Sequence, residues 1–188
     1  MDQNVASKST RAAELVGRVA ELQAKYPPPS QVRTAERANP VFAALDQFME
    51  CVRYLNTRRS EARMALDSEA AVQDLLFFML RSCVPDLVPE SPTDRVASRY
   101  TIKDFRSVSL RTIVEAKFVR DKDHGKSISR EIHDDIETYR TDPMCETLIF
   151  FIYDPDVNIP DRGALKRHVE VERTYAGRSL SCHVLVHP

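Results

Sequence analysis

The chain has 188 residues and a mass of 21.5 kDa, with 43% hydrophobic and 29% charged residues. This composition supports one modest globular domain, or a domain with a small appendage, and argues against disorder throughout. The longest apolar runs, 75–80 and 148–153, are six residues each, whereas a membrane span needs roughly 20. We therefore expect no membrane partner.

The N-terminus and the cysteines indicate a reducing compartment. Residues 1–14 contain no apolar core of a secretory signal, so a cytoplasmic location is the expectation. The four cysteines lie 32, 62 and 37 positions apart, without the close pairs that zinc sites use. We expect free thiols rather than disulfides or a structural metal site.

Charge is balanced overall but uneven along the chain. The formal net charge is −1, which by itself argues neither for nor against nucleic acid as a partner. Residues 95–130, however, hold ten lysines and arginines against four acidic residues. This block can neutralise several phosphates if its cations share one face; otherwise it is a solvated surface.

Three helices are predicted in the first half of the chain. Residues 9–26 have apolar positions at helical spacing and are followed by three prolines. Asn39 and Pro40 form a good helix start, and an apolar stripe follows as far as Leu55. A third helix begins at residue 67 or 68 and ends near residue 83.

The chain divides near residue 65. We expect an N-terminal helical segment, 1–65, whose two helices lie outside the core, and a second domain over 66–188. The third helix carries two polar residues on its apolar side: Glu69 and Gln73 are four residues apart and share a face with Val72. A carboxylate and an amide are expected to point towards the core there.

After Pro92 the pattern changes to short β-segments. Strands are predicted over 99–105 and 110–119, joined as a hairpin by the polar residues 106–109. A charged loop, 120–126, leads into the next helix.

The later elements alternate between helix and strand. A helix with an apolar stripe from Ile128 to Tyr139 is ended by Asp142 and Pro143. A nearly continuous apolar strand then covers 147–153, and a last strand covers 181–186. The whole order predicts an α/β (α+β) fold, a mixed sheet of four to five strands flanked by helices.

The reactive groups concentrate in the predicted hairpin. Positions two apart on a strand project from one face, so Glu115 and Lys117 point together, and pairing of the strands brings Asp104 to the same place. Two carboxylates bind a hard cation such as Mg²⁺, which polarises a phosphoryl oxygen and activates water. Lys117 would orient that water or stabilise developing charge, and the product would be a cut phosphodiester.

The acid-x-Lys triplet alone is weak evidence, because chance produces such triplets in this composition. Its context is stronger, since Glu115 and Lys117 interrupt an otherwise apolar strand, where paired charges are costly unless they are used or solvated. The alternative is an edge strand with a solvated face. The four glycines cannot build a phosphate-binding loop or a dinucleotide fingerprint, and no serine-hydrolase or zincin motif occurs.

Five segments, in order, resemble the PD-(D/E)xK nuclease superfamily, especially its restriction-endonuclease branch related to DpnII and MboI. These segments are 68–76, 98–105, 113–117, 131–139 and 148–155.

The resemblance implies a restriction-endonuclease-like fold and DNA cleavage that depends on Mg²⁺ or Mn²⁺, in bacterial restriction or antiviral defence. It implies Asp104 and Glu115 as metal ligands, Lys117 beside the attacking water and Glu69 as an outer carboxylate. Lys103 stands where the motif has its proline, a common departure that leaves Asp104 in place. Relatives of this kind are commonly dimers, so a homodimer is expected.

Two classes of function stay open. The first is a metal-dependent deoxyribonuclease, for which Arg99, Lys126 and Gln73 are the candidate DNA contacts. The second is a non-catalytic or partner-activated DNA-binding subunit of a larger defence complex that keeps the nuclease fold. The complete set of three catalytic residues favours the first. An RNA substrate is less favoured because RNA-module signatures are absent. Residues 1–65 would dimerise, contact DNA or dock a partner protein.

Overall fold

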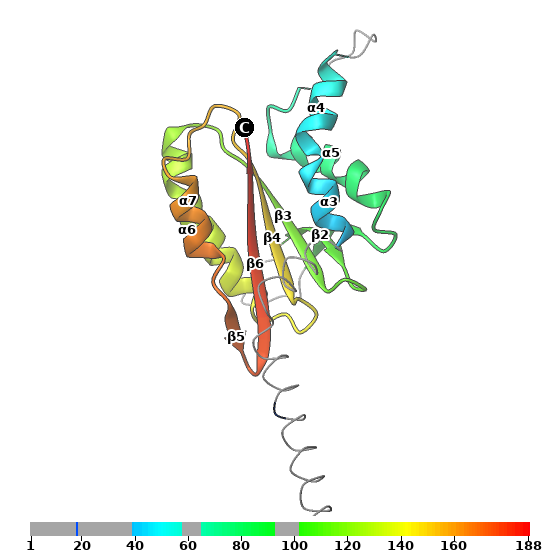
Figure 1. The fold of residues 1–188 in the computed structure, drawn as a ribbon, viewed down its shortest axis with the longest axis vertical. Helices are drawn as coiled ribbons and strands as arrows, with labels where there is room; N and C mark the ends of the chain where they lie inside the picture. The colour runs from blue at the N-terminus through cyan, green and yellow to red at the C-terminus, as the bar shows by residue number, and fades with distance from the viewer. Residues whose placement is uncertain (1–17, 19–38, 58–64, 93–101) are drawn as a thin grey trace, which may run out of the picture. The chain divides into compact units, whose positions relative to one another are not determined.

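The computed structural model describes residue 18 and residues 39–57, 65–92 and 102–188, with the backbone alone for 90–92 and 102–104. Its centre is a mixed sheet of six strands in the order β1-β2-β3-β4-β6-β5 (Figure 1). The strands are β1 (Val88–Pro92), β2 (Ile102–Ser107), β3 (Thr112–Phe118), β4 (Thr147–Tyr153), β5 (Arg173–Tyr175) and β6 (Arg178–His187). The α/β class and the mixed sheet are confirmed, with more strands than expected.

Strand direction follows from the length of each connection. β2 and β3 pair antiparallel through a short turn, as the predicted hairpin requires, with Phe105 opposite Val114. β3 and β4 are parallel, as are β4 and β6, and each parallel pair is joined through a helix. β3 is therefore an interior strand, and the alternative of a solvated edge strand is wrong.

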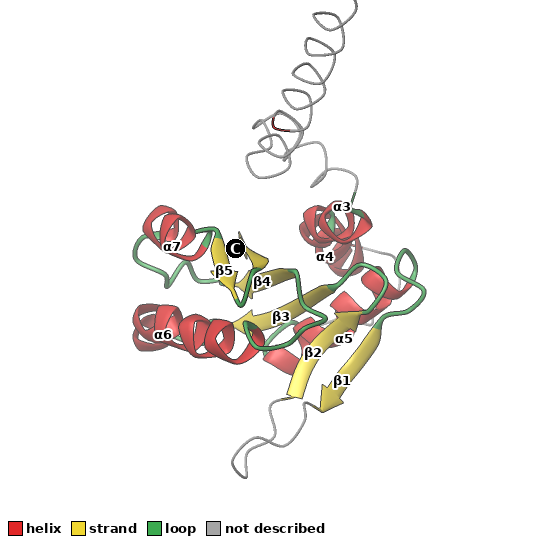
Figure 2. Ribbon diagram, turned by 90° about the horizontal axis from the view of Figure 1, so that it is seen from below, coloured by secondary structure: helices red, strands yellow, loops and turns green. Residues whose placement is uncertain are grey.

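Helices cover both faces of the sheet (Figure 2). On one face, α6 (Lys122–Tyr139) and α7 (Arg162–Val169) pack on Ile113, Phe150 and Val184 in one buried cluster. On the other face lie α4 (Phe48–Thr57) and α5 (Glu69–Arg81). There the Phe48 ring lies 4.6 Å from that of Phe151, and the Phe77 ring stacks 6.5 Å from Phe105.

The helix predicted from residue 40 is two helices, α3 (Pro40–Asp46) and α4, with Gln47 in a turn between them. Asn39 caps the first as expected, since its side chain accepts a hydrogen bond from the Val41 amide at 3.0 Å. The expectation that the helix over 48–57 lies outside the core is wrong, because Phe48 is fully buried against the sheet. The helix predicted over 9–26 falls outside the described residues.

The predicted loop 120–126 is mostly helical. Asp121 caps α6 by accepting hydrogen bonds from the amides of Asp123 and His124 at 2.9 and 2.8 Å. Glycine is needed at position 125 of this helix, because the Asn158 carbonyl packs where a β-carbon would lie.

The two strands absent from the prediction lie at the two edges of the sheet. β1 contains Pro89 and Pro92, which weaken a strand pattern and are tolerated at an edge. β5 has three residues and turns into β6 through Ala176 and Gly177, both at positive φ (50° and 78°). No helix among the described residues is long and apolar enough to cross a membrane.

Candidate active site

The candidate site is centred on β3, where two charged side chains face α6. Alternation along the strand puts Glu115 and Lys117 on the side of Ile113, which belongs to the cluster under α6. Glu115 is 4% exposed, and the Lys117 side chain is 14% exposed. Burial of charged groups to this extent requires partners.

Tyr139, in the last turn of α6, is the partner of Glu115. Its hydroxyl donates a hydrogen bond to Glu115 Oε1, and the tyrosine itself is 1% exposed. The contact gives the buried phenol a hydrogen-bond partner and fixes the orientation of the carboxylate.

Asp135, one turn earlier in α6, is the partner of Lys117. Its Oδ2 lies 2.9 Å from Lys117 Nζ, and its side chain is 21% exposed. Asp135 therefore turns towards the sheet, whereas its neighbour Asp134 is exposed to solvent.

The pKa of both partners is shifted by burial and by their charges. Burial lowers the pKa of Lys117, but the Asp135 carboxylate, with smaller contributions from Glu115 and Glu69, outweighs it, so the pKa is raised above its ordinary value. Burial raises the pKa of Asp135, and the Lys117 ammonium opposes that shift. Lys117 thus remains an ammonium at neutral pH.

Asp104 lies in β2, one position before Phe105. Phe105 pairs with Val114 at the end of an antiparallel ladder, so a continuation of the ladder by one step would set Asp104 opposite Glu115. This is the strand position that the hairpin prediction requires. The Asp104 side chain lies outside the described part of the structure, so its role as a ligand stays a prediction.

Glu69 is the first residue of α5, after the N-cap Ser68. It is exposed, and its charge acts on the pKa of Lys117. Gln73, one turn later, is half-buried and lines a groove of about 490 Å³ together with Phe77 and Phe105. The prediction that both side chains point towards the core is therefore wrong for Glu69, which is exposed, and agrees with the half-buried Gln73.

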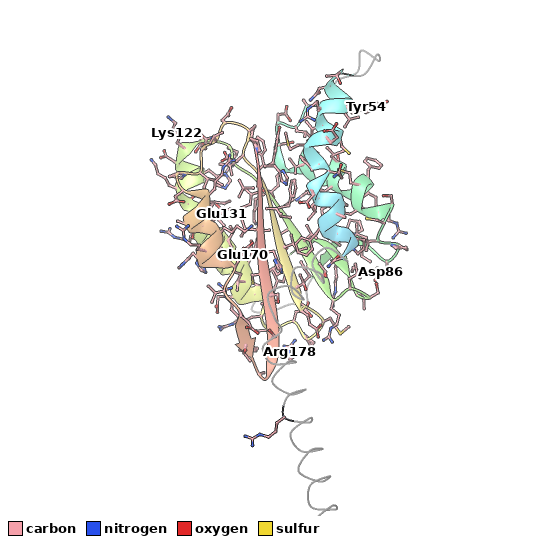
Figure 3. The ribbon with its side chains drawn as sticks, in the orientation of Figure 1. Tyr54, Asp86, Lys122, Glu131, Glu170 and Arg178 are labelled. Atoms are coloured by element: carbon pink, nitrogen blue, oxygen red, sulfur yellow. The ribbon has the colours of Figure 1, made fainter. Side chains whose placement is uncertain are left out.

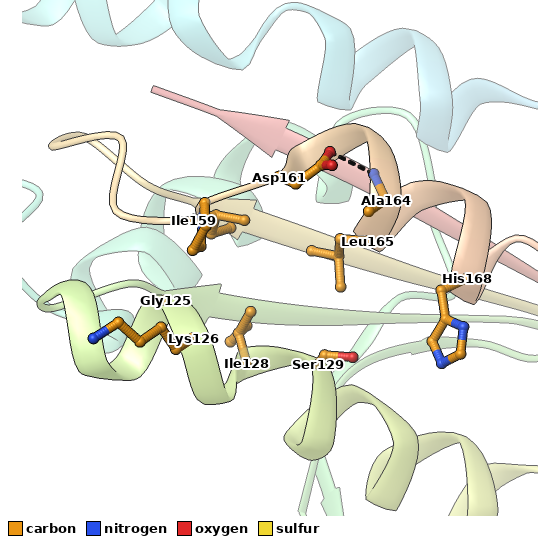
Figure 4. A pocket seen from close by; sticks show the side chains of 10 residues that line it. Gly125, Lys126, Ile128, Ser129, Ile159, Asp161, Ala164, Leu165 and His168 are labelled. Carbon is orange, nitrogen blue, oxygen red and sulfur yellow. Dashed lines mark hydrogen bonds between the residues drawn. The ribbon is translucent and has the colours of Figure 1, made fainter.

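Only one of the two basic candidates lies in the described part of the structure. Arg99 lies outside the described residues. Lys126 is exposed and pairs with Asp123 at 2.9 Å. It lines a second groove, of about 330 Å³, between α6 and α7 rather than the site on β3 (Figure 4).

The donor chemistry fits a hard divalent cation. Glu115, Asp135 and Glu69 outnumber the single Lys117 among the groups that interact here, so the described charges sum to a negative value. No group of three metal-ligating side chains occurs among the residues whose side chains are described, and Asp104 is not one of them. A cation ligand set of Asp104 and Glu115 is consistent with this arrangement.

Sequence reasoning missed Asp135, Tyr139 and Asp154. Asp135 lies one position before Ile136 of the apolar stripe of α6, Tyr139 belongs to that stripe, and four-residue spacing on a helix is a signal for a shared face. Asp154 is fully buried after β4, where its carboxylate accepts hydrogen bonds from the Asn158 amide at 2.7 Å and from Arg162 at 2.9 Å. An aspartate directly after a buried strand is a detectable signal for such an anchor.

Comparison with known proteins gives one family. The family model for the DpnII-MboI restriction endonucleases (REase) matches residues 40–188. No curated protein and no solved structure matches the chain.

Proposed function

Because this chain belongs to the DpnII-MboI restriction endonuclease family, we propose that it is a metal-dependent deoxyribonuclease that hydrolyses DNA phosphodiester bonds in bacterial restriction or antiviral defence. The observation that carries the proposal is the burial of Glu115 and Lys117 side by side on an interior strand. Charged groups in such a position are costly unless they serve a site.

Asp104 and Glu115 would hold Mg²⁺ or Mn²⁺ through carboxylate oxygens. When bound, the cation supplies a Lewis acid for the phosphoryl group and lowers the pKa of a bound water. Glu69, at the start of α5, would add negative charge at the edge of this site.

Lys117 would act as a hydrogen-bond donor at the site. Its Nζ lies 2.9 Å from the Asp135 carboxylate, and this ion pair favours the protonated, hydrogen-bond-donating form of the side chain. An ammonium beside the scissile phosphate orients the attacking water or stabilises the charge that develops on phosphoryl oxygens.

The remaining assignments extend the same proposal. Arg99 and Lys126 would contact DNA phosphates, and Gln73 would contact DNA from the start of α5. A homodimer would present two sites to the two strands, and the part of residues 1–65 that precedes α4 would serve that dimer, the DNA or a partner protein. A cytoplasmic location agrees with a DNA substrate.

Incubation of purified protein with supercoiled plasmid tests the proposal. We expect cutting with Mg²⁺, none with EDTA, and a loss of about 10²–10³-fold in rate for Lys117→Ala. Lys166→Ala, a lysine paired with Glu170 on α7, is the control and should cut at the wild-type rate. Cutting by Asp104→Ala at the wild-type rate would exclude the proposed ligand set. A wild-type protein that binds DNA and never cuts it would favour the non-catalytic subunit.

A further inference from the structure

One helix contacts both charged residues of β3. In α6, Asp135 and Tyr139 are four residues apart, and in β3, Lys117 and Glu115 are two residues apart. The earlier helix residue meets the later strand residue, as expected for a helix that returns the chain between two parallel strands.

The distance between Asp135 and Tyr139 along α6 is close to the distance between Lys117 and Glu115 along β3. Four residues of an α-helix advance about 6 Å, and two residues of a strand advance about 6.6 Å. A helix that lies antiparallel along β3 can therefore meet both side chains at once. The backbone geometry explains why both contacts form from one element.

We propose that Asp135 and Tyr139 are positioning residues of the nuclease site, acting through Lys117 and Glu115. This inference rests on the proposed function and adds to it the residues that orient the reacting groups. Asp135 holds the Lys117 ammonium in place by an ion pair. Tyr139 holds the Glu115 carboxylate by a hydrogen bond.

Stability alone gives little reason for such a network. The four side chains adjoin an apolar cluster that includes Ile113, Ile132 and Ile136. Apolar residues of similar volume usually replace a buried ion pair at no loss of stability or with a gain. An ordered site, in contrast, needs polar partners for both Glu115 and Lys117. Mutation of groups that orient metal ligands and reacting side chains typically lowers metal affinity or activity by about 10–100-fold.

Metal binding tests the Tyr139 contact without any cleavage. Titration calorimetry with Mn²⁺ alone should show about 10–100-fold weaker binding for Tyr139→Phe than for the wild type. This substitution removes only the hydroxyl and keeps the buried ring. Tyr54→Phe is the matched control, since Tyr54 is 68% exposed on α4 (Figure 3) and its hydroxyl should not affect Mn²⁺ binding.

Single-turnover cleavage tests the Asp135 contact. Asp135→Asn keeps the shape of the side chain and removes its charge. It should lower the cutting rate about 10–100-fold, with DNA affinity in EDTA within about twofold of wild type. Asp135→Glu, which restores the carboxylate, should recover part of the rate. Asp134→Asn, on the exposed neighbour, should leave both quantities unchanged.

The outcomes separate this inference from the proposed function. Wild-type Mn²⁺ binding by Tyr139→Phe, together with wild-type cutting by Asp135→Asn, overturns the inference even if Lys117→Ala abolishes cleavage. A loss of thermal stability in Asp135→Asn with no change in rate also overturns it, since that is a purely structural effect. A wild-type protein that never cuts overturns the proposed function, while weaker Mn²⁺ binding by Tyr139→Phe still supports the positioning of Glu115.

Discussion

Asp86 joins two turns that are distant in sequence. Its Oδ1 accepts a hydrogen bond from the Ser107 hydroxyl and its Oδ2 accepts one from the Ser109 amide, both at 2.8 Å (Figure 3). The Ser109 amide, followed by the Ser107 hydroxyl, lowers the pKa of Asp86 below its ordinary value. The residue therefore connects the end of α5 to the hairpin that carries the candidate site.

Substitution Asp86→Asn should lower the melting temperature by about 2–4 °C, the effect of about one net hydrogen bond in a chain of this size. Because the folded pKa lies below the unfolded value of about 3.9, this stabilisation is fully present above that value and is lost as the pH falls through the folded pKa. Thermal melts of wild type and variant should differ equally at pH 5 and pH 7 and converge at lower pH. The control is Asp134→Asn. A difference that persists unchanged at the lowest pH would contradict the linkage.

The periodicity of a strand does not predict which residues of another element pair with its charged side chains. The two-residue spacing of Glu115 and Lys117 was sufficient to predict that they share a face, because strand geometry is local. Their partners on α6 depend on where that helix docks against the sheet. Asp135 is one position from the buried Ile136, and only the docked helix shows that it turns inwards rather than to solvent.

At the scale of elements, α6 packs closely against the loop that follows β4. Asp154 holds that loop by accepting hydrogen bonds from the Asn158 and Ile159 amides at 2.7 and 3.2 Å. The loop then approaches α6 at Gly125, where an added β-carbon would overlap the Asn158 carbonyl group. This contact sets the distance between the start of α6 and the end of β4.

Gly125→Ala should therefore destabilise the fold by about 1–3 kcal/mol, as overpacking does, although alanine is the better helix former. Gly163→Ala in α7 is the matched control, because its added β-carbon would lie 3.2 Å from the end of the Arg167 side chain and 3.3 Å from Asp161 Oδ1, two side-chain atoms rather than backbone. Urea denaturation of both variants measures the difference. Equal stability of the two variants would exclude the close approach as the reason for glycine at 125.

The errors of element prediction have local physical causes. Gly125 and the surrounding charges are typical of a loop, and the Asp121 cap that starts the helix four residues earlier competes with that signal. The stripe of Ile128, Ile132 and Ile136 was sufficient for the rest of α6. β1 and β5 are strands because they pair with β2 and β6, since neither has an apolar pattern of its own.

At the scale of the whole molecule, the basic block 95–130 is divided between structure and surface. Arg106, Arg111 and Lys117 form ion pairs with Asp142, Glu146 and Asp135. Other cations of the block, Arg120, Lys122, Lys126 and Arg130, are exposed on α6 or just before it. A count of charges along the sequence therefore overestimates the number that can meet phosphates.

Lys126→Ala should weaken DNA binding and reduce the slope of log affinity against log salt concentration by about one. The physical reason is the release of one fewer counterion when one fewer phosphate is neutralised. Fluorescence anisotropy with a DNA duplex in EDTA, over a range of salt concentrations, measures the slope, and Lys166→Ala is the control. The same slope for Lys126→Ala and wild type would remove this end of α6 from the DNA interface.

The position of β4 between β3 and β6 affects how the chain is made. A nascent chain that has completed β3 and β4 but not β6 presents the apolar strand 147–153 as an open edge. Such an edge can pair with another chain and lead to aggregation. Because the residues of β6 follow β4 only after α7 and β5, this edge of β4 stays uncovered until β6 has been synthesised. Expression at low temperature or with a chaperone should therefore reduce aggregation of this chain.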